Sequence, residues 1–288
     1  MATIQKYKTE KGDRWRVRWR DNKGRQRSKT FDRQRLAKDF MIKLEHEVRE
    51  GSYIEPSSLT LKEYLEAWIE SYKTNISPNT ERGYRINIMH ICSIIGDKPL
   101  QKIVPADIEM AYAKLRERLS GTSVLYIHRT LNRALKFAEK QRLVRRNPCA
   151  FVEAPKKSKN FQAKFVHPDD VQKYLDAFKG HYLYPAVCLA MFCGLRRGEI
   201  LGLQWKDIDW KESIIHIRHN MTLDGLKAPK SGQARTVPLS EAMKKVLKEQ
   251  KKKQQYFMEK LWDEYFRSDF VVTHDDGSLI KLQTLSAI

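Results

Sequence analysis

Residues 193–210, CGLRRGEILGLQWKDIDW, contain the most specific motif of this 288-residue sequence. Gly194 precedes Arg196, and the apolar run that begins at Ile200 predicts a short helix that starts close to the arginine. An arginine at the start of a helix can be held in one direction, and its planar guanidinium matches two phosphate oxygens at once. An ordinary surface cation gives the same local pattern, so the flanking sequence has to decide.

A second basic residue follows in residues 226–239, LKAPKSGQARTVPL. The turn residues Ser231 and Gly232 directly follow Lys230, which predicts a lysine at the tip of a hairpin, within reach of a bound backbone. Upstream, the β-branched run in residues 213–219 predicts a strand. His216 and His219 then face opposite sides of that strand and do not form a metal-chelating pair.

Helical periodicity dominates the middle of the chain. Apolar residues recur at helical spacing in four segments separated by Ser, Pro and Gly. Thr60 and Glu63 have the spacing of a capping box at the start of the first segment. The four expected helices lie within residues 61–72, 84–95, 108–119 and 124–138. Further helices are expected near 168–179, near 183–193 and from Ser240 onward.

The amino terminus has the alternation of a strand in residues 14–20, RWRVRWR. Successive side chains of a strand point to opposite faces, so one face is apolar and the other is cationic. A helix at residues 36–48 is expected to cover the apolar face, leaving the cationic face open to a groove of duplex DNA. The residues predicted to bind DNA are Arg14, Arg16, Arg18, Arg20, Lys23, Arg25, Arg27 and Lys29.

Composition favours a polyanionic partner. The 55 Lys and Arg residues against 35 Asp and Glu give a formal charge of +20, which is typical of nucleic-acid-binding proteins. No apolar run is long enough to span a bilayer and the first residues do not have the pattern of a signal peptide, so a cytoplasmic protein without membrane contact is expected. The four cysteines have no zinc-ribbon spacing, which predicts reduced thiols and no metal site.

Together, these features resemble the tyrosine recombinases, specifically phage and integrative-element integrases. Residues 193–210 are similar to the first arginine motif of that family, and KSGQARTVPL is similar to its catalytic hairpin and the following strand. The segment LNRALKFAEKQRLVRRNP, residues 131–148, resembles the end of the family's core-binding domain. The order of the motifs and of the expected domains also agrees with the family.

The resemblance implies a multidomain α+β protein. Its parts are a small three-stranded sheet with one helix, a four-helix SAM-like core-binding domain, and a partial mixed α/β catalytic domain. The expected boundaries are 1–55 for an AP2-like arm-type DNA-binding domain, 60–150 for the core-binding domain, and 165–288 for the catalytic domain.

The resemblance also implies site-specific DNA breakage and rejoining through a phosphotyrosyl intermediate, without a metal, nucleotide or other cofactor. Arg196 would stabilise charge on the non-bridging oxygens of the scissile phosphate, and Lys230 would protonate the departing 5′ oxygen. Glu199 would support the arginine by a hydrogen bond. The implied process is DNA recombination or integration, including integration of a viral genome.

The sequence departs from the family after the hairpin. It contains no His-x-x-Arg stretch there, so the second arginine, its histidine and the nucleophilic tyrosine of the family are all missing. Tyr256 and Tyr265 precede the expected place and are interpreted as packing residues. This chain is therefore expected to be truncated and unable to cleave DNA alone, which leaves its status as an enzyme uncertain.

Two roles follow. The chain is either a DNA-binding regulator or competitor of an intact integrase, or the larger piece of an active recombinase. The expected partners are double-stranded DNA at arm-type and core-type sites and, for the competitor, an intact integrase; a monomer is expected in solution, in the cytoplasm of a bacterial host. A runner-up outside the family is a transcriptional regulator or RNA-binding protein without chemistry.

Overall fold

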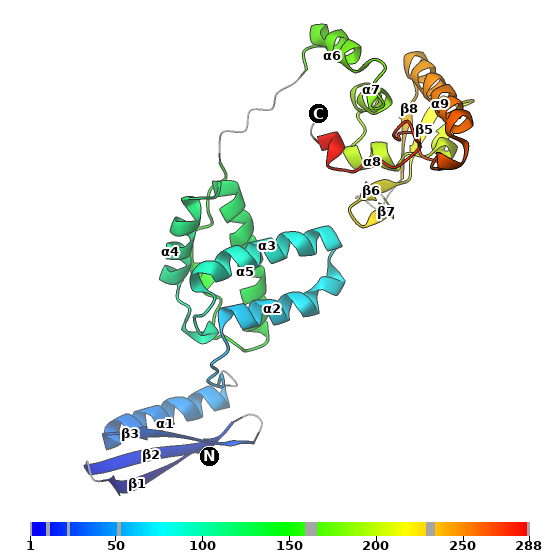
Figure 1. Cartoon of the computed structure of the whole chain (residues 1–288). Helices are drawn as coiled ribbons and strands as arrows, with labels where there is room; N and C mark the ends of the chain where they lie inside the picture. Colours follow the sequence, from blue (N-terminus) through cyan, green and yellow to red (C-terminus); the bar gives the residue numbers. More distant parts are fainter. Residues whose placement is uncertain are drawn as a thin grey trace. The chain divides into compact units, whose positions relative to one another are not determined.

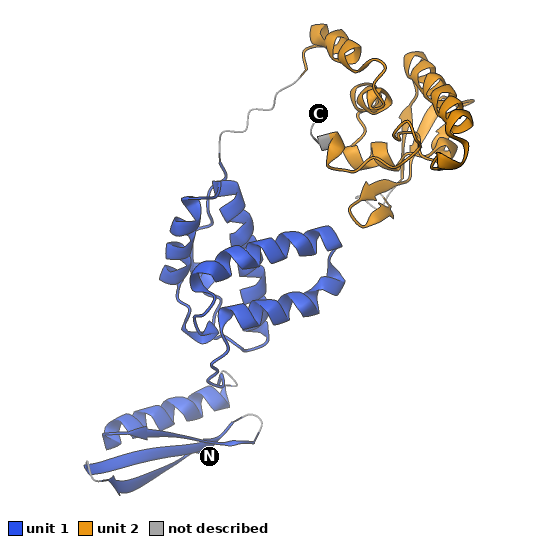
Figure 2. Ribbon diagram, viewed as in Figure 1, with its two compact units in different colours: residues 1–161 blue, residues 162–288 orange. Residues whose placement is uncertain are grey.

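The computed structural model describes residues 2–9, 12–21, 24–50, 53–158, 166–228 and 234–286. The chain divides into two compact units, residues 1–161 and 162–288 (Figure 2). The first unit holds a small sheet with one helix and, separately, a bundle of helices, each with its own hydrophobic core. The second unit is mixed α/β around a single core. The predicted α+β class is therefore confirmed.

A three-stranded antiparallel sheet forms the amino-terminal part of the first unit (Figure 1). Helix α1 lies along one face of this sheet, where Val17 and Trp19 are buried and Trp15 is partly buried. The predicted division of residues 14–20 into an apolar and a cationic face is confirmed. The elements are β1 (Thr3–Thr9), β2 (Gly12–Arg20), β3 (Gln26–Phe31) and α1 (Gln34–Arg49).

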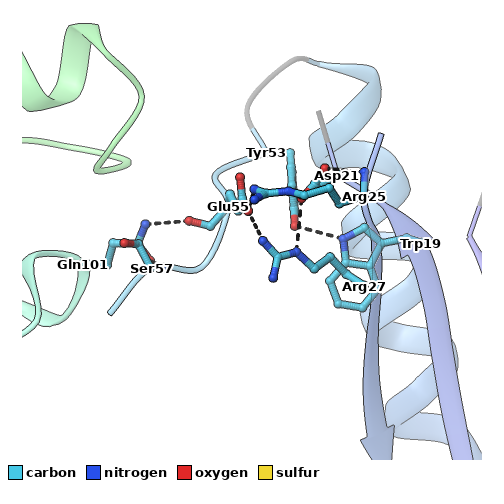
Figure 3. A network of polar contacts seen from close by, with 8 residues as sticks. All are labelled: Trp19, Asp21, Arg25, Arg27, Tyr53, Glu55, Ser57 and Gln101. Carbon is cyan, nitrogen blue, oxygen red and sulfur yellow. Dashed lines mark hydrogen bonds and ion pairs between the residues drawn. The ribbon is translucent and has the colours of Figure 1, made fainter. Parts of the chain in front are cut away.

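The segment after α1 is fastened to the sheet at one end and to the bundle at the other (Figure 3). The indole Nε1 of Trp19 donates to the Tyr53 hydroxyl at 2.9 Å in a buried contact. Two residues further on, the Glu55 carbonyl accepts a hydrogen bond from Gln101 Nε2 at 2.8 Å. The backbone N–H of Ser57 donates to Gln101 Oε1 at 3.1 Å. One glutamine therefore holds the connection at two points.

Replacing Tyr53 with phenylalanine is expected to destabilise the sheet by about 1–3 kcal/mol, because the buried Trp19 N–H loses its acceptor. Thermal unfolding followed by near-ultraviolet circular dichroism of the sheet's aromatic residues measures the loss. The matched control is Tyr7→Phe, which removes an exposed hydroxyl of the same sheet. Equal stability of the two variants would show that the buried Trp19–Tyr53 hydrogen bond does not stabilise the sheet.

Four helices with an apolar core make up the rest of the first unit. The predicted capping box is present, since Glu63 N donates to Thr60 Oγ1 at 3.2 Å and Thr60 N donates to Glu63 Oε2 at 2.8 Å. Hydrogen bonds that the Thr60 backbone N–H and hydroxyl donate to the Glu63 carboxylate lower the pKa of Glu63. Ser77 and Ser120 cap two of the following helices. The helices are α2 (Leu61–Tyr72), α3 (Pro78–Ile95), α4 (Pro105–Arg116) and α5 (Gly121–Lys140).

The second unit packs helices around a short antiparallel sheet with strand order β4-β5-β8. The segment with Val271 and Val272 completes its core, and Val271 N donates to the Leu203 carbonyl at 3.0 Å. A separate hairpin is formed by β6 (Asn220–Thr222) and β7 (Gly225–Lys227). The other α-helices and β-strands of this unit are α6 (Val171–Phe178), α7 (Tyr184–Cys193), α8 (Arg197–Gly202), β4 (Ile208–Asp209), β5 (Ile214–Ile217), β8 (Arg235–Pro238) and α9 (Glu241–Leu261).

All four cysteines lie in described segments and none forms a disulfide. Cys149 and Cys188 are buried, whereas Cys92 and Cys193 are only partly buried. In the part of the chain that the structure describes, no helix is both long and apolar enough to cross a membrane. The same described segments hold no cluster of His, Cys, Asp and Glu side chains that could bind a metal ion.

Candidate DNA interface and phosphate site

The face of the sheet that α1 does not cover carries a row of arginines along the central strand β2. The strand register shows which side chains flank the row, because directly paired residues of an antiparallel sheet share a face. The flanking residues are uncharged and can form hydrogen bonds. They are Thr3, Gln5 and Tyr7 on β1 and Gln26, Ser28 and Thr30 on β3. We call this surface, with Arg14, Arg16, Arg18 and Arg20, the arginine face.

The guanidinium of Arg16 is stacked on an aromatic ring of the neighbouring strand. Its Cζ lies 4.6 Å from the ring centroid of Tyr7. The Tyr7 hydroxyl donates to Thr30 Oγ1 at 3.3 Å, so the ring is held across the central strand. Hydrogen bonds with Thr30 and Arg16 lower the pKa of Tyr7. Arg14, in contrast, forms an ion pair with Asp32.

Two of the additional cations predicted for this surface lie on the other face of the sheet. Arg27 pairs with Trp19 and Lys29 pairs with Val17, so both point toward the side of α1. The Lys29 ammonium lies 4.8 Å from the ring centroid of Phe40 on that helix. The prediction that Arg27 and Lys29 lie on the same cationic face as the arginines of β2 is therefore wrong.

The two arginines around the β2–β3 turn are held by carboxylates (Figure 3). Arg25 Nε and Arg27 Nε each lie 3.1 Å from Oδ2 of Asp21, whose side chain is fully buried. Both guanidinium groups also form ion pairs with Glu55. This arrangement ties the sheet to the segment that leaves it, so Arg25 and Arg27 have structural partners. Lys23 lies outside the described residues.

In the second unit, Glu199 is the centre of a polar group at the start of α8. Gly194 ends α7 in the left-handed conformation with φ 59°, which L residues adopt only with strain, and Arg196 becomes the residue before α8. The backbone N–H of Arg196 donates to Glu199 Oε2 at 2.8 Å, and its Nη1 donates to Glu199 Oε1 at 3.0 Å. The structure therefore brings Arg196 and Glu199 together, as the family resemblance implied.

A second arginine, which sequence reasoning did not select, completes this group. Arg235 on β8 donates from Nη1 to Glu199 Oε1 at 2.6 Å and from Nη2 to Glu199 Oε2 at 2.8 Å. The carboxylate is only 2% exposed, whereas 38% of the Arg235 side chain and 69% of the Arg196 side chain reach solvent. The buried acid therefore holds two arginines at the surface of the unit. Lys230 lies outside the described residues.

The protonation of Glu199 is set by these contacts. Burial by itself would raise the pKa of Glu199, but hydrogen bonds from Arg235 and from the backbone and side chain of Arg196 outweigh it and lower the pKa to about 2. The carboxylate is thus charged at neutral pH, and its two arginines compensate for the cost of burying it.

A pH dependence of stability follows. The pKa of Glu199 is lower in the folded chain than the value of about 4.3 expected in the unfolded chain. Its stabilising contribution is therefore complete above that value and is lost as the pH falls toward 2, at a rate approaching about 1.4 kcal/mol per pH unit. Urea denaturation of the second unit between pH 5 and 2 measures this dependence. Unfolding at low pH takes up a proton at Glu199, and Glu199→Gln should abolish this uptake. The free energy of unfolding should therefore depend less on pH in the variant, and an unchanged dependence would contradict the low pKa of Glu199 in the folded chain.

The two histidines of the β5 region have different surroundings. His216 lies in the strand, and His219 Nδ1 lies 3.3 Å from Oδ2 of the buried Asp207. Arg218 Nη1 lies 3.7 Å from the other oxygen of Asp207. His219 thus has a carboxylate partner.

The two tyrosines interpreted as packing residues differ in exposure. Tyr265 is partly buried against Gly277, and burial raises the pKa of its hydroxyl. Tyr256 is 57% exposed on α9 and meets Phe257 edge-on at 5.3 Å. The interpretation therefore holds for Tyr265 but is wrong for Tyr256.

Comparison with known protein families gives two matches along this chain. The model described as phage integrase family matches residues 164–288, which include Arg196, Glu199 and Arg235. The model described as phage integrase, N-terminal SAM-like domain, matches residues 60–116 within the helical bundle.

The individual proteins that are similar to this chain are also integrases and recombinases. The chain is 27% identical to the ICEBs1 integrase of Bacillus subtilis over 255 residues, covering 83% of this chain and 67% of that protein. It is 24% identical to a tyrosine recombinase XerC-like protein of Caldanaerobacter subterraneus, covering 72% of this chain but only 59% of the relative. The fold resembles a lambda integrase bound as a tetramer to a Holliday junction, with a TM-score of 0.65, 19% identity and coverage of 98% and 78% of the two chains.

Proposed function

The chain belongs to the tyrosine recombinase family, and from this premise we propose that it binds duplex DNA for site-specific breakage and rejoining of strands. The observation that carries the proposal is the buried Glu199 between Arg196 and Arg235, inside the region that matches the phage integrase family. A second support is the arginine face, on which four arginines of the central strand lie in a row.

The arginine face suits the major groove of duplex DNA. Neighbouring strands are about 4.8 Å apart, so three strands present a surface about 10 Å across between the outer strand axes. The major groove is about 12 Å wide and admits a β-ribbon or small sheet. Arginines in the middle of that surface would meet base edges or phosphates, and the polar flanking residues can form hydrogen bonds without repelling the backbone.

The group around Glu199 suits the scissile phosphate. In the proposed reaction, a tyrosine hydroxyl loses its proton to water and its oxygen forms a bond to phosphorus while the bond to the 5′ oxygen breaks, and negative charge increases on the phosphoryl oxygens. Arg196 would stabilise this charge, because its guanidinium is largely exposed and is anchored by Glu199. Lys230 would donate the proton to the departing 5′ oxygen. Arg235 and Glu199 would hold Arg196 in place.

The proposed setting is the cytoplasm of a bacterial host, where the chain would be a monomer in solution and would bind arm-type and core-type DNA sites. Residues 1–55, 60–150 and 165–288 would act as the arm-binding, core-binding and catalytic parts. A competing role is occupation of these sites in place of an intact integrase.

Binding of the full chain to a fluorescent duplex and to its single strand, measured by anisotropy from 50 to 200 mM salt, tests the proposal. Duplex should bind more tightly, with an affinity that falls steeply with salt because phosphate-bound counterions are released. A preference for the single strand would favour the RNA-binding alternative, and absence of duplex binding at 50 mM salt would reject the proposal.

A suicide substrate that traps phosphotyrosyl adducts tests whether this chain cleaves DNA alone. An adduct that depends on Arg196 would show that a tyrosine of these 288 residues is the nucleophile and would contradict the expected inability to cleave. Duplex binding without any adduct agrees with the competitor role and equally with a piece of an active recombinase.

A further inference from the structure

Arg16 occupies the centre of the arginine face. It lies midway along β2, the middle strand, with Gln5 directly opposite on β1 and Thr30 directly opposite on β3. Arg20, in contrast, ends the strand and is exposed. If the sheet enters the major groove, as proposed above, the centre of the face approaches the groove floor, where base edges are exposed.

The direction of the Arg16 side chain is also restricted. Its guanidinium lies on the ring of Tyr7, and Tyr7 is itself tied to Thr30 on the far strand. A stacked guanidinium has already lost much of its rotamer freedom, so less conformational entropy is lost when it forms two hydrogen bonds to a ligand. Arg14 is paired with Asp32 and therefore has a competing partner.

A planar, pre-oriented fork of N–H donors at the groove floor matches one base in particular. Guanine presents two acceptors, O6 and N7, at the spacing that arginine fills with a bidentate contact. The other edges lack this pair of acceptors, since adenine and cytosine expose an amino donor and thymine a single acceptor. Tyr7 and Thr30 provide no negative charge that would compete for the guanidinium.

We propose that Arg16, held by Tyr7, recognises a guanine base in the major groove and so determines part of the sequence preference of this chain. The neighbouring Arg18 and Arg20 then act mainly on the phosphate backbone. This inference rests on the proposed function, because it assumes that the arginine face meets duplex DNA.

Selection of tight binders from a random duplex library with the full chain provides the test. Wild type should enrich at least one invariant G·C pair. Arg16→Lys keeps the charge but removes the planar fork, so it should lose the preference for that pair by about 10-fold or more while the salt slope stays the same. Tyr7→Leu should reduce the same preference less strongly, and Tyr7→Phe should leave most of it. Arg18→Lys, on the same strand and face, is the matched control and should keep the preference.

Replacing the selected guanine with 7-deazaguanine removes the N7 acceptor and tests the contact directly. Wild type should lose about 10-fold in affinity for this duplex, whereas Arg16→Ala should lose nothing further. Circular dichroism confirms that each variant is folded.

Three results would overturn the inference and leave the proposed function intact. They are duplex binding without any selected base pair, a selected pattern unchanged in Arg16→Lys, and equal effects of 7-deazaguanine on wild type and Arg16→Ala. Failure of the proposed function looks different, because no variant would then bind duplex DNA at 50 mM salt.

Discussion

Replacing Arg235 with alanine is expected to destabilise the second unit by about 3 kcal/mol, although this residue lies on a short strand near the surface. The reason is that the Glu199 carboxylate, only 2% exposed, would keep its charge and lose two hydrogen bonds of 2.6 and 2.8 Å. Breaking a buried ion pair from one side leaves an uncompensated charge, which costs more than the pair contributes. Arg196 keeps its contacts with Glu199, and Arg235 is partly exposed. The expected loss of stability is therefore at the lower end of the range of about 3–5 kcal/mol for breaking a buried ion pair.

Hydrogen exchange of peptides from β5 and α7 measures this loss locally. The chain has two compact units, so a single global transition is not expected, and peptides of the first unit provide an internal reference. Protection should fall in the second unit alone.

Two further variants show whether Arg235→Ala loses stability because the charge of Glu199 is uncompensated or because contacts are lost in general. Lys173→Ala breaks the exposed pair with Asp170 and should change stability by less than about 1 kcal/mol. The double variant Glu199→Gln, Arg235→Met removes both charges and should be more stable than Arg235→Ala. If Arg235→Ala is as stable as Lys173→Ala, the assigned role of Arg235 is wrong.

The elements of this fold that depend on local periodicity could be predicted from the sequence. The alternation of residues 14–20 and the capping box of Thr60 and Glu63 determine strand and helix through neighbours in the chain, and both are present. Arg196 and Glu199 are three residues apart across the start of a helix, so their contact was also within reach of sequence reasoning.

Arg235 could not be selected in this way, because it is 36 residues from Glu199 and meets it only through the pairing of β8 with β5. One general argument would have pointed to it: a glutamate within an apolar helix needs more cationic partners than one exposed arginine provides.

The sequence contained enough information to place Arg27 and Lys29, although their face was not predicted correctly. Every second residue of a strand points to the same face, so Arg27 and Lys29 share a face with Phe31. The apolar ring of Phe31 packs on the side of the sheet that α1 covers. The partners of Arg25 were harder to foresee, because Glu55 is 30 residues away from it. Net charge therefore overestimates the number of cations available to a ligand.

Replacing Arg16, Arg18 and Arg20 with glutamine is expected to weaken duplex binding by about 100-fold near 100 mM salt and to flatten the salt dependence of log K by about 1.8. The value follows from a slope of about 0.9 for each phosphate that a cation neutralises, with Arg18 and Arg20 on the phosphate backbone and Arg16 on a base. All three side chains lie on the face opposite α1, and glutamine keeps their polarity. Anisotropy titrations from 50 to 200 mM salt measure both quantities.

The matched control removes the same charge from the helix that covers the other face. Arg35, Lys38 and Lys43 are exposed on α1, and replacing them with glutamine lowers the formal charge from +20 to +17, as the first triple variant does. Because the two variants have the same total charge, attraction by net charge alone predicts equal effects. A contact at the arginine face predicts a flatter salt dependence only for the first variant. Equal slopes for both would therefore contradict the interface, even if affinity fell in each.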